Sequence, residues 1–359
     1  IDFCSKKISV MKKILLVYGD IRTVNIGDYI QSLAAKQYFD DEDYELVNRD
    51  ELGLYSGAPA KVIMNTWLTY KPENWPPSNK ITPLFVALHI NSSVEKIMLS
   101  PENIGYFKKY EPIGCRDIYT MNLFKSRGVD AYFSSCLTTT LDLTYKVPKH
   151  REGIYIVDPL AYMPNGKGVI EILKTLFLAV LNVKSVLHII RNYRKNNKYK
   201  LRLSKIGVGR ILLITKSYLF LRKLLDKDVF DQAIFITQYH EGNEYKSEEE
   251  RFLRANELLR KYASAKYVIT SRIHCALPCL GFQTPVIYIR NLEEGKKSTC
   301  RLGGLGDFFN VVEVQNTKII SKFFDGKLKA DFCFKNKDTY KIYHDSLIEK
   351  CLNFIKNGK

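Results

Sequence analysis

The sequence predicts an α/β protein of two domains, each built on a parallel, doubly wound sheet, with both sheets facing one cleft. Short apolar runs alternate with helical patterns along most of the chain, which is typical of strand–helix–strand units. The 359 residues, 46% of them apolar, are enough for two cores and too polar overall for an integral membrane protein.

The first domain is predicted to comprise residues 11–150, because Met11 begins a typical natural start and residues 1–10 read as an extension. Its predicted strands are Lys13–Tyr18, Tyr44–Val47, Val62–Met64, Leu84–Leu88, Ile113–Cys115 and Ala131–Phe133. Its predicted helices are Tyr29–Phe39, Pro101–Tyr110 and Asp117–Arg127, the last closed by Gly128. A hinge is expected from Pro148 to Gly153.

The second domain is predicted to comprise residues 151–335. Its predicted strands are Ile154–Val157, Ala233–Thr237, Tyr267–Thr270 and Val286–Ile289, and Ser247 with Glu250 forms a capping box that opens a helix. A basic helical insertion, about residues 169–227, separates the first two strands. A terminal helix within residues 336–359 is expected to pack back toward the first domain.

The net charge of +17 is concentrated in this insertion. From Lys174 to Lys227 there are fourteen Lys or Arg residues and one acid, Asp226. Charges interrupt the apolar runs, which argues against a transmembrane span. Three explanations stay open: an amphipathic helix on an anionic bilayer, which we prefer, a basic lid whose apolar face packs on its own domain, or a nucleic-acid surface.

Composition argues against several other kinds of site. Apart from Cys275 and Cys279 on one predicted helix, the eight cysteines lack the short paired spacings of zinc sites or disulfide frameworks, so reduced thiols in the cytosol are expected. No secretory signal, no Gly-x-Gly-x-x-Gly fingerprint and no histidine cluster for a metal is visible. No cofactor is expected, although a divalent metal stays open because Asp28 and Asp117 should lie near the cleft.

The most informative segment is Ser271-Arg272-Ile273-His274. It follows the apolar run Tyr267–Thr270 and precedes a helix-like stretch. A buried strand followed at once by Arg, His and a helix places a fixed cation, a titratable imidazole and backbone N–H groups at the carboxyl edge of a sheet. The segment therefore predicts an anion site.

Polar residues also follow the predicted strands of the first domain. They are Asn25, Gly27 and Asp28 at a helix start, Asn65 and His89 at two strand ends, and Arg116 with Asp117 at a third. Each also has a purely structural explanation. The first group could form a helix cap and turn, Asn65 could be a capping residue, and His89 could simply have its hydrogen bonds met within the fold. Arg116 and Asp117 could form a surface ion pair rather than an anion clamp. Individually, none of them identifies a function.

Together, these segments resemble the polysaccharide pyruvyl transferase family over nearly the whole chain. The matching pieces are Asn25-Ile-Gly27-Asp28-Tyr-Ile-Gln-Ser-Leu-Ala, Asn65-Thr-Trp67, Gly114-Cys-Arg116-Asp117, Gly128-Val-Asp-Ala-Tyr-Phe-Ser-Ser-Cys136-Leu-Thr138, the block from Ala265 to Pro278, and Gly281-x-x-Thr284-Pro285-Val286. The chain departs from the family at Cys275, where many members have Gly, and in the basic insertion, which has no counterpart in the family's common core.

The resemblance implies a GT-B-like fold of two Rossmann-like domains. It also implies transfer of a pyruvyl group from phosphoenolpyruvate to two hydroxyls of one sugar, forming a cyclic ketal during capsular or exopolysaccharide biosynthesis. The donor would bind in the second domain to Arg272, with Arg116 and Arg301 as further clamps, because guanidinium groups bind carboxylate and phosphate bidentately. The other implied substrate-binding residues are Ser271, Ile273, Asn25, Gly27, Asp28, Asn65 and His89.

His274 is the implied general acid. A proton must reach the methylene carbon of phosphoenolpyruvate before a sugar hydroxyl attacks, phosphate leaves and a second hydroxyl closes the ring. An imidazole between anions keeps its proton near neutral pH, which suits this role. The acceptor is expected to be a glycan linked to polyprenyl phosphate, which places the protein in the cytoplasm, peripheral at the inner face of the membrane through residues 169–227.

Two alternative functions are kept. A GT-B glycosyltransferase that uses a sugar nucleotide would have the same architecture. A basic nucleic-acid-binding protein would use the charged insertion, with Tyr193 and Tyr199 stacking on bases, although no nucleic acid is the preferred expectation. The acceptor sugar and the oligomeric state stay open.

Overall fold

The computed structural model describes residues 11–19, 23–39, 43–160, 168–196, 207–241, 244–293 and 300–356. These residues divide into two compact units. The first unit consists of the described residues within 1–19, 32–137 and 343–359, and the second of those within 20–31 and 138–342. The second unit therefore includes residues 25–28, which the sequence assigned to the first domain. The extension 1–10 and Tyr199 lie outside the described residues, and the common cleft of a GT-B arrangement stays a prediction.

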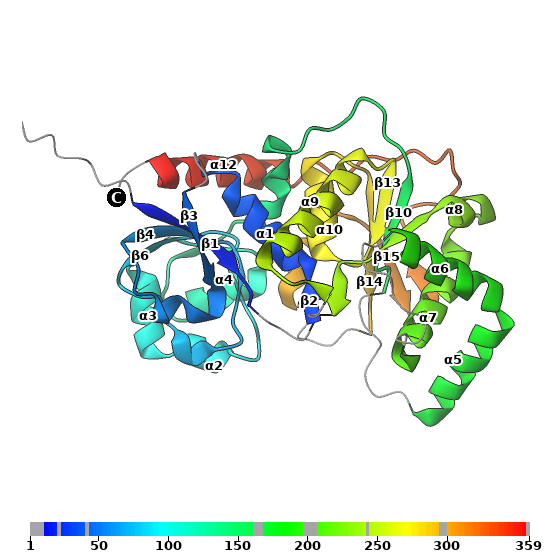
Figure 1. The fold of residues 1–359 in the computed structure, drawn as a ribbon, viewed down its shortest axis with the longest axis horizontal. Helices are drawn as coiled ribbons and strands as arrows, with labels where there is room; N and C mark the ends of the chain where they lie inside the picture. The colour runs from blue at the N-terminus through cyan, green and yellow to red at the C-terminus, as the bar shows by residue number, and fades with distance from the viewer. Residues whose placement is uncertain are drawn as a thin grey trace, which may run out of the picture. The chain divides into compact units, whose positions relative to one another are not determined.

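The first unit contains a parallel sheet of four strands (Figure 1). The strands are β1 (Lys12–Val17), β3 (Tyr44–Asn48), β4 (Ala60–Met64) and β6 (Ile81–Phe85), in the order β3-β1-β4-β6. All five residues of β4 are buried, as in a strand covered on both faces. The strand order reverses between β1 and β4, so this unit is doubly wound and ligands are expected at the carboxyl ends of those two strands.

Two short parallel pairs complete the strands of the first unit. They are β5 (Trp67–Leu68) with β7 (His89–Ile90), and β8 (Ile113–Cys115) with β9 (Ala131–Phe133). The strand predicted to continue to Leu88 ends at Phe85, because Ala87 adopts a φ of +54° and the chain turns there. Leu88 then bridges to Cys115, which connects β8 to this edge.

The helices of the first unit are α2 (Glu95–Met98), α3 (Pro101–Lys108), α4 (Ile118–Lys125) and most of α12 (Lys341–Lys356), together with the last residues of α1 (Ile26–Lys36) and the 3-10 helices η1 (Arg49–Leu54) and η2 (Pro72–Asn74). Asp117 is the N-cap of α4, and its Oδ1 accepts a hydrogen bond from the Thr120 N–H. Lys61 donates from Nζ to the Phe354 carbonyl at 2.7 Å, which places a cation at the C-terminal end of α12.

The second unit contains a sheet of six strands in the order β11-β10-β13-β14-β15-β16. They are β10 (Ile154–Val157), β11 (Ile234–Ile236), β13 (Tyr267–Thr270), β14 (Val286–Asn291), β15 (Asn310–Gln315) and β16 (Lys318–Ser321), and only the β15–β16 pairing is antiparallel. The parallel strands follow the order 2-1-3-4-5 rather than the classic dinucleotide-binding order, and this order reverses between β10 and β13. The α/β fold with largely parallel sheets is therefore confirmed.

Helices cover both faces of this second sheet. The helices of the second unit are α5 (Val169–Leu181), α6 (Val183–Asn196), α7 (Val208–Leu224), α8 (Lys227–Gln232), α9 (Glu248–Ser264) and α10 (Ile273–Gly281), with the 3-10 helices η3 (Leu137–Leu143), η6 (Cys300–Leu302) and η7 (Gly306–Phe308). In Figure 1, α9 and α10 lie on one side of the sheet, and α6 and α7 on the other. Ser247 caps α9 as predicted, since its Oγ accepts a hydrogen bond from the Glu250 N–H, while the Glu250 carboxylate accepts one from the Lys246 N–H rather than from the Ser247 N–H.

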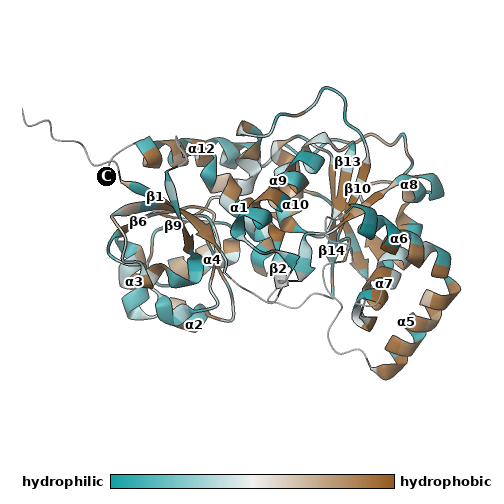
Figure 2. Cartoon of the chain, in the orientation of Figure 1, coloured by the Kyte–Doolittle hydropathy of each residue, from teal (hydrophilic) through white to brown (hydrophobic). Residues whose placement is uncertain are grey.

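The basic insertion forms three helices with different surroundings. α6 and α7 bury apolar residues such as Ile189 and Phe220 in one core with Ile156 and Ile287 of the sheet, so these two helices pack on their own domain. α5 packs against α7 and leaves much of its apolar surface exposed, and Figure 2 shows that α5 is hydrophobic along its length. No helix in the described ranges is both long and apolar enough to cross a bilayer.

Candidate functional site

The predicted anion site lies where the strand order of the second sheet reverses. Asp158 directly follows β10 and Arg272 follows β13, and Arg272 Nε donates to Asp158 Oδ2 at 3.0 Å. Ser271 donates from Oγ to the Asp158 carbonyl at 2.6 Å. Both charged side chains are about nine-tenths buried, so this ion pair fixes the direction of the guanidinium group.

Arg272 lines a pocket of about 310 Å³ in the second unit. The pocket is bounded by the ends of β10, β11 and β13 and by the insertion helices α6 and α7. Its polar lining includes Asp158, Tyr239 and Arg210, and the Arg272 guanidinium carbon lies 5.1 Å from the centre of the Tyr239 ring. A pocket of this size at a strand-order reversal, with a fixed cation, suits a small anionic ligand.

His274 lies two residues after Arg272, at the second position of α10, and outside the pocket lining. The described residues that line the pocket do not include His274, whose side chain is buried against the start of α1. Gln238 joins the two parts: its N–H donates to Asp158 Oδ2 at 3.0 Å, and its Nε2 donates to the His274 carbonyl at 3.2 Å. The position of His274 is therefore coupled to that of Arg272 through Gln238, which uses its backbone N–H toward Asp158 and its side chain toward His274.

The Asn25-Ile-Gly27-Asp28 motif belongs to the same unit as His274. Strand β2 (Thr23–Asn25) pairs with β12 (Tyr239–Glu241), and the Ile26 N–H donates to the Gln238 carbonyl. Asn25 Oδ1 accepts a hydrogen bond from the Gly27 N–H at 3.1 Å, and Asp28 Oδ1 accepts one from Gln31 Nε2. The tertiary structure thus brings this motif together with the Ser271–His274 segment, 243 or more residues later in the sequence.

Arg116, Asp117 and His89 form a buried charged group in the first unit. His89 Nδ1 lies 2.7 Å from Asp117 Oδ2, and Arg116 Nε lies 3.8 Å from the same oxygen. Burial favours a raised pKa for Asp117, but the hydrogen bond and charge of His89 and the charge of Arg116 outweigh it, so the pKa of Asp117 is lowered. The alternative of a surface ion pair is wrong, because all three side chains are buried.

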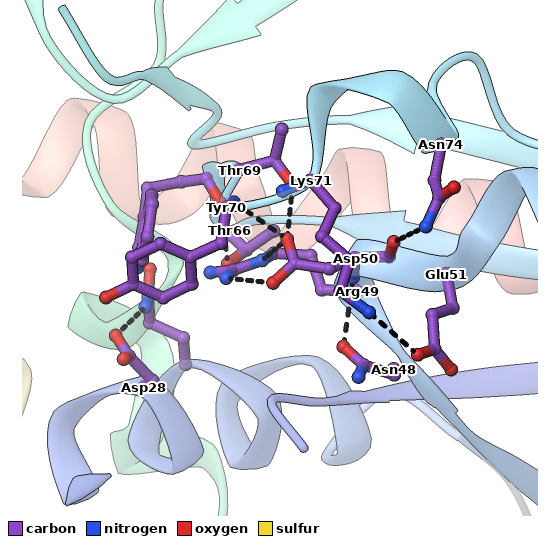
Figure 3. A network of polar contacts seen from close by, with 12 residues as sticks. Asp28, Asn48, Arg49, Asp50, Glu51, Thr66, Thr69, Tyr70, Lys71 and Asn74 are labelled. Carbon is purple, nitrogen blue, oxygen red and sulfur yellow. Dashed lines mark hydrogen bonds and ion pairs between the residues drawn. The ribbon is translucent and has the colours of Figure 1, made fainter. Parts of the chain in front are cut away.

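A second buried ion pair at the carboxyl edge of the first sheet was missed by the sequence analysis. Figure 3 shows Asp50 accepting hydrogen bonds from Arg49, Thr69 and the Tyr70 N–H. The Arg49 side chain is fully buried, and its guanidinium carbon lies 4.0 Å from the centre of the Trp67 ring. The pair therefore holds the chain just after Asn65, itself buried at the end of β4.

The remaining predicted residues lie apart from the pocket. Ile273 is half-buried at the first position of α10, and Arg301 is half-buried in η6, outside the pocket lining. Within the described ranges, no three His, Cys, Asp or Glu side chains are grouped so as to hold a metal ion.

Comparison with known families decides what this arrangement belongs to. The family model for polysaccharide pyruvyl transferase matches residues 104–293, which is more than half of the chain. The chain belongs to this family. Searches of curated proteins and of solved structures gave no match.

The match places the principal features of this pyruvyl transferase inside the family region. Residues 104–293 include Arg116, Asp158, Gln238 and the Ser271–His274 segment. Asp158 and Gln238 were not singled out from the sequence, although Asp158 directly follows a predicted strand, as Ser271 does. The rule that polar residues at the carboxyl ends of parallel strands form sites would have found Asp158.

Proposed function

We propose that this pyruvyl transferase uses phosphoenolpyruvate as its donor and forms a cyclic ketal on two hydroxyls of one sugar of a glycan. Arg272 carries the proposal, because its guanidinium is fixed by Asp158 at the reversal of strand order and lines a pocket of about 310 Å³. Family membership supplies the general role in polysaccharide synthesis. The donor carries a phosphate and a carboxylate, and a directed guanidinium binds either group bidentately.

The proposed reaction balances without a redox cofactor. A proton adds to the methylene carbon of the donor, and a sugar hydroxyl attacks the adjacent carbon to form a tetrahedral phosphoketal. The carbon–oxygen bond to phosphate then breaks, and the second hydroxyl closes the ring. Of the two hydroxyl protons lost, one balances the new methyl hydrogen and the other leaves with phosphate. Arg272 stabilises the departing phosphate charge in this scheme.

His274 is the proposed proton donor. The family resemblance supplies this role. His274 is buried outside the described pocket lining, and Gln238 couples its backbone to Asp158 and hence to Arg272. In the His274→Gln variant, release of inorganic phosphate from phosphoenolpyruvate should fall by about 10²- to 10⁴-fold. The assay uses a mixture of methyl hexosides as acceptors. Unchanged release in this variant would reject His274 as the acid, while the donor assignment would still stand.

Binding of the donor tests the proposal without an acceptor. Phosphoenolpyruvate at 100 times its dissociation constant should stabilise the protein by about 2.7 kcal/mol against urea unfolding, and nucleotide sugars should give no protection. Protection by a nucleotide sugar and not by phosphoenolpyruvate would favour the glycosyltransferase alternative. Salt-sensitive oligonucleotide binding without either effect would favour the nucleic-acid alternative.

We also propose that α5 lies on an anionic membrane surface on the cytoplasmic side, where a lipid-linked acceptor would be presented. Exposed apolar residues gather on one side of the helix: Val169, Ile170, Leu173, Phe177, Val180 and Leu181. At about 100° per residue these positions span an arc of about 120°. Lys174 borders this arc and Lys184 follows in α6, and both are exposed. Apolar surface bordered by cations is the chemistry of an anionic bilayer interface.

Vesicle sedimentation tests the membrane proposal. The protein should bind vesicles that contain phosphatidylglycerol, and Phe177→Glu should abolish binding. The control is Ile342→Glu, at a position 74% exposed on α12, which should bind like the wild type. Equal binding by the Phe177 variant, or no binding by the wild type, would reject the proposal.

A further inference from the structure

We propose that Arg210 of the basic insertion is a second anion-binding residue of the Arg272 pocket. The two guanidinium groups would then share the two anionic groups of one donor molecule. This inference rests on the proposed function and goes beyond it, because it assigns part of the donor site to a helix of the insertion rather than to the turns after the sheet strands.

Arg210 lies in the first turn of α7 and lines the same pocket as Arg272. Tyr193 of α6 also lines that pocket. Burial and the charge of Asp158 raise the pKa of Tyr193, and the charges of Arg210 and Arg272 both oppose that rise. Both arginines therefore lie within electrostatic range of one hydroxyl group.

The charge of Arg272 is offset by Asp158 at 3.0 Å, so this pair alone gives the pocket little net charge. Among the described residues, no acidic side chain forms an ion pair with Arg210. The unbalanced charge of Arg210 therefore makes the pocket cationic, and a bound dianion would complete its charge balance.

The start of α7 adds to this positive potential. The helix follows Gly207 and has no acidic residue in its first turn, and Gly209 contributes to the pocket lining with backbone atoms only. A helix N-terminus carries about +0.5 of an elementary charge, so a cation there is unfavourable for the helix. The position of Arg210 is therefore better explained by binding of an anionic ligand than by a contribution to the stability of α7.

The walls of the pocket strengthen these charges. Much of the lining is apolar, including Leu160, Ile189, Leu213 and Phe235. Apolar walls lower the local dielectric constant, so each guanidinium attracts an anion more strongly than it would in water. Such walls also exclude water from the carbon at which positive charge develops.

The other arginines expected to clamp the donor do not share these properties. Arg301 is not in the pocket lining, and the charge of Arg116 is balanced by Asp117 in the first unit. Within the pocket, Arg210 is the described residue that can supply the second guanidinium.

Donor binding by matched variants of α7 tests the inference. Arg210→Gln should raise the dissociation constant for phosphoenolpyruvate at least about tenfold, measured by donor-dependent shifts in the thermal midpoint, because one charge-assisted contact is lost. The midpoint without donor should not fall. The control is Arg222→Gln, at an exposed position on the same helix outside the pocket, which should bind the donor like the wild type.

The outcomes separate this inference from the proposed function. If phosphoenolpyruvate binds the wild type and Arg210→Gln equally, and Arg272→Lys weakens binding, the role of Arg210 is overturned and the proposed function stands. If phosphoenolpyruvate fails to bind the wild type, both are overturned. Weaker binding in both arginine variants, with normal binding by Arg222→Gln, supports both.

Discussion

Gly27 lies directly against His274. A Cβ atom on Gly27 would stand 3.1 Å from the His274 Cβ and 3.2 Å from its Nδ1, closer than ordinary contacts. Asn25 Oδ1 lies 3.1 Å from the same point, so the space is limited from two sides. The absence of a side chain at Gly27 therefore sets how close the start of α1 can approach the proposed proton donor.

Gly27→Ala should consequently displace His274 by a few tenths of an ångström. We expect phosphate release to fall about tenfold, since misplaced catalytic groups lose rate steeply, while donor binding changes little. The matched control is Gly105→Ala, where a new Cβ meets no atom within 4 Å in the exposed part of α3. That control should keep full activity and gain about 0.5–1 kcal/mol of stability. Full activity in Gly27→Ala would show that the contact does not position His274.

Asp158→Asn should leave the Arg272 charge without its counter-ion. Removing one partner of a buried pair costs about 3–5 kcal/mol, so the free energy of unfolding should fall by that order. Phosphoenolpyruvate should restore part of the loss, because its anionic groups replace the carboxylate. Urea unfolding with and without the donor measures both effects, and Asp307→Asn, at an exposed position, serves as the control. A variant as stable as the wild type would contradict this account of the ion pair.

Arg49→Met should destabilise the first unit. Asp50 would lose the partner of a buried pair, at a cost of about 3–5 kcal/mol, and Trp67 would lose its stacked guanidinium. The double variant Arg49→Met, Asp50→Asn should recover part of that stability, because no unpaired charge is left buried. Urea unfolding followed by tryptophan fluorescence measures the cycle. Equal stability of the single and double variants would argue against the pair as the cause.

Stability should decrease in acid because of two carboxylates. The pKa values of Asp50 and Asp117 are lowered from the usual 3.8; for Asp50, the hydrogen bonds and charge of Arg49 outweigh burial. A lowered pKa stabilises the fold fully above the unfolded value of 3.8, and this contribution disappears as pH falls through the folded values. Urea midpoints between about pH 6 and pH 2 should drop less in Asp50→Asn than in the wild type. Asp130→Asn, at an exposed position, should follow the wild type.

The sequence located the Ser271–His274 segment because its signal is local. A run of buried residues, Tyr267–Thr270, is followed at once by polar residues and a helix, and the structure has the strand at those positions. The end of β6 was misplaced because Val86–Leu88 is as apolar as the strand before it. Only the turn at Ala87 separates Val86–Leu88 from the strand, and none of these residues is of a type that favours turns.

The surroundings of the insertion could not be predicted from its composition. α5 and α7 are both apolar runs with scattered charges, yet α7 is buried against the sheet and α5 exposes one side. Which apolar face gains a partner depends on the helices packed around it rather than on the helix's own pattern.

The sequence by itself determined the family, the alternation of strands and helices, and the strand end that carries Arg272 and His274. The tertiary structure alone decided that Asp158 directs Arg272, that Gly27 lies against His274, and that Arg210 lines the same pocket. The physical reason is that strand and turn patterns arise from neighbouring residues, whereas these pairs form only when folding brings distant segments to the edge where the strand order reverses.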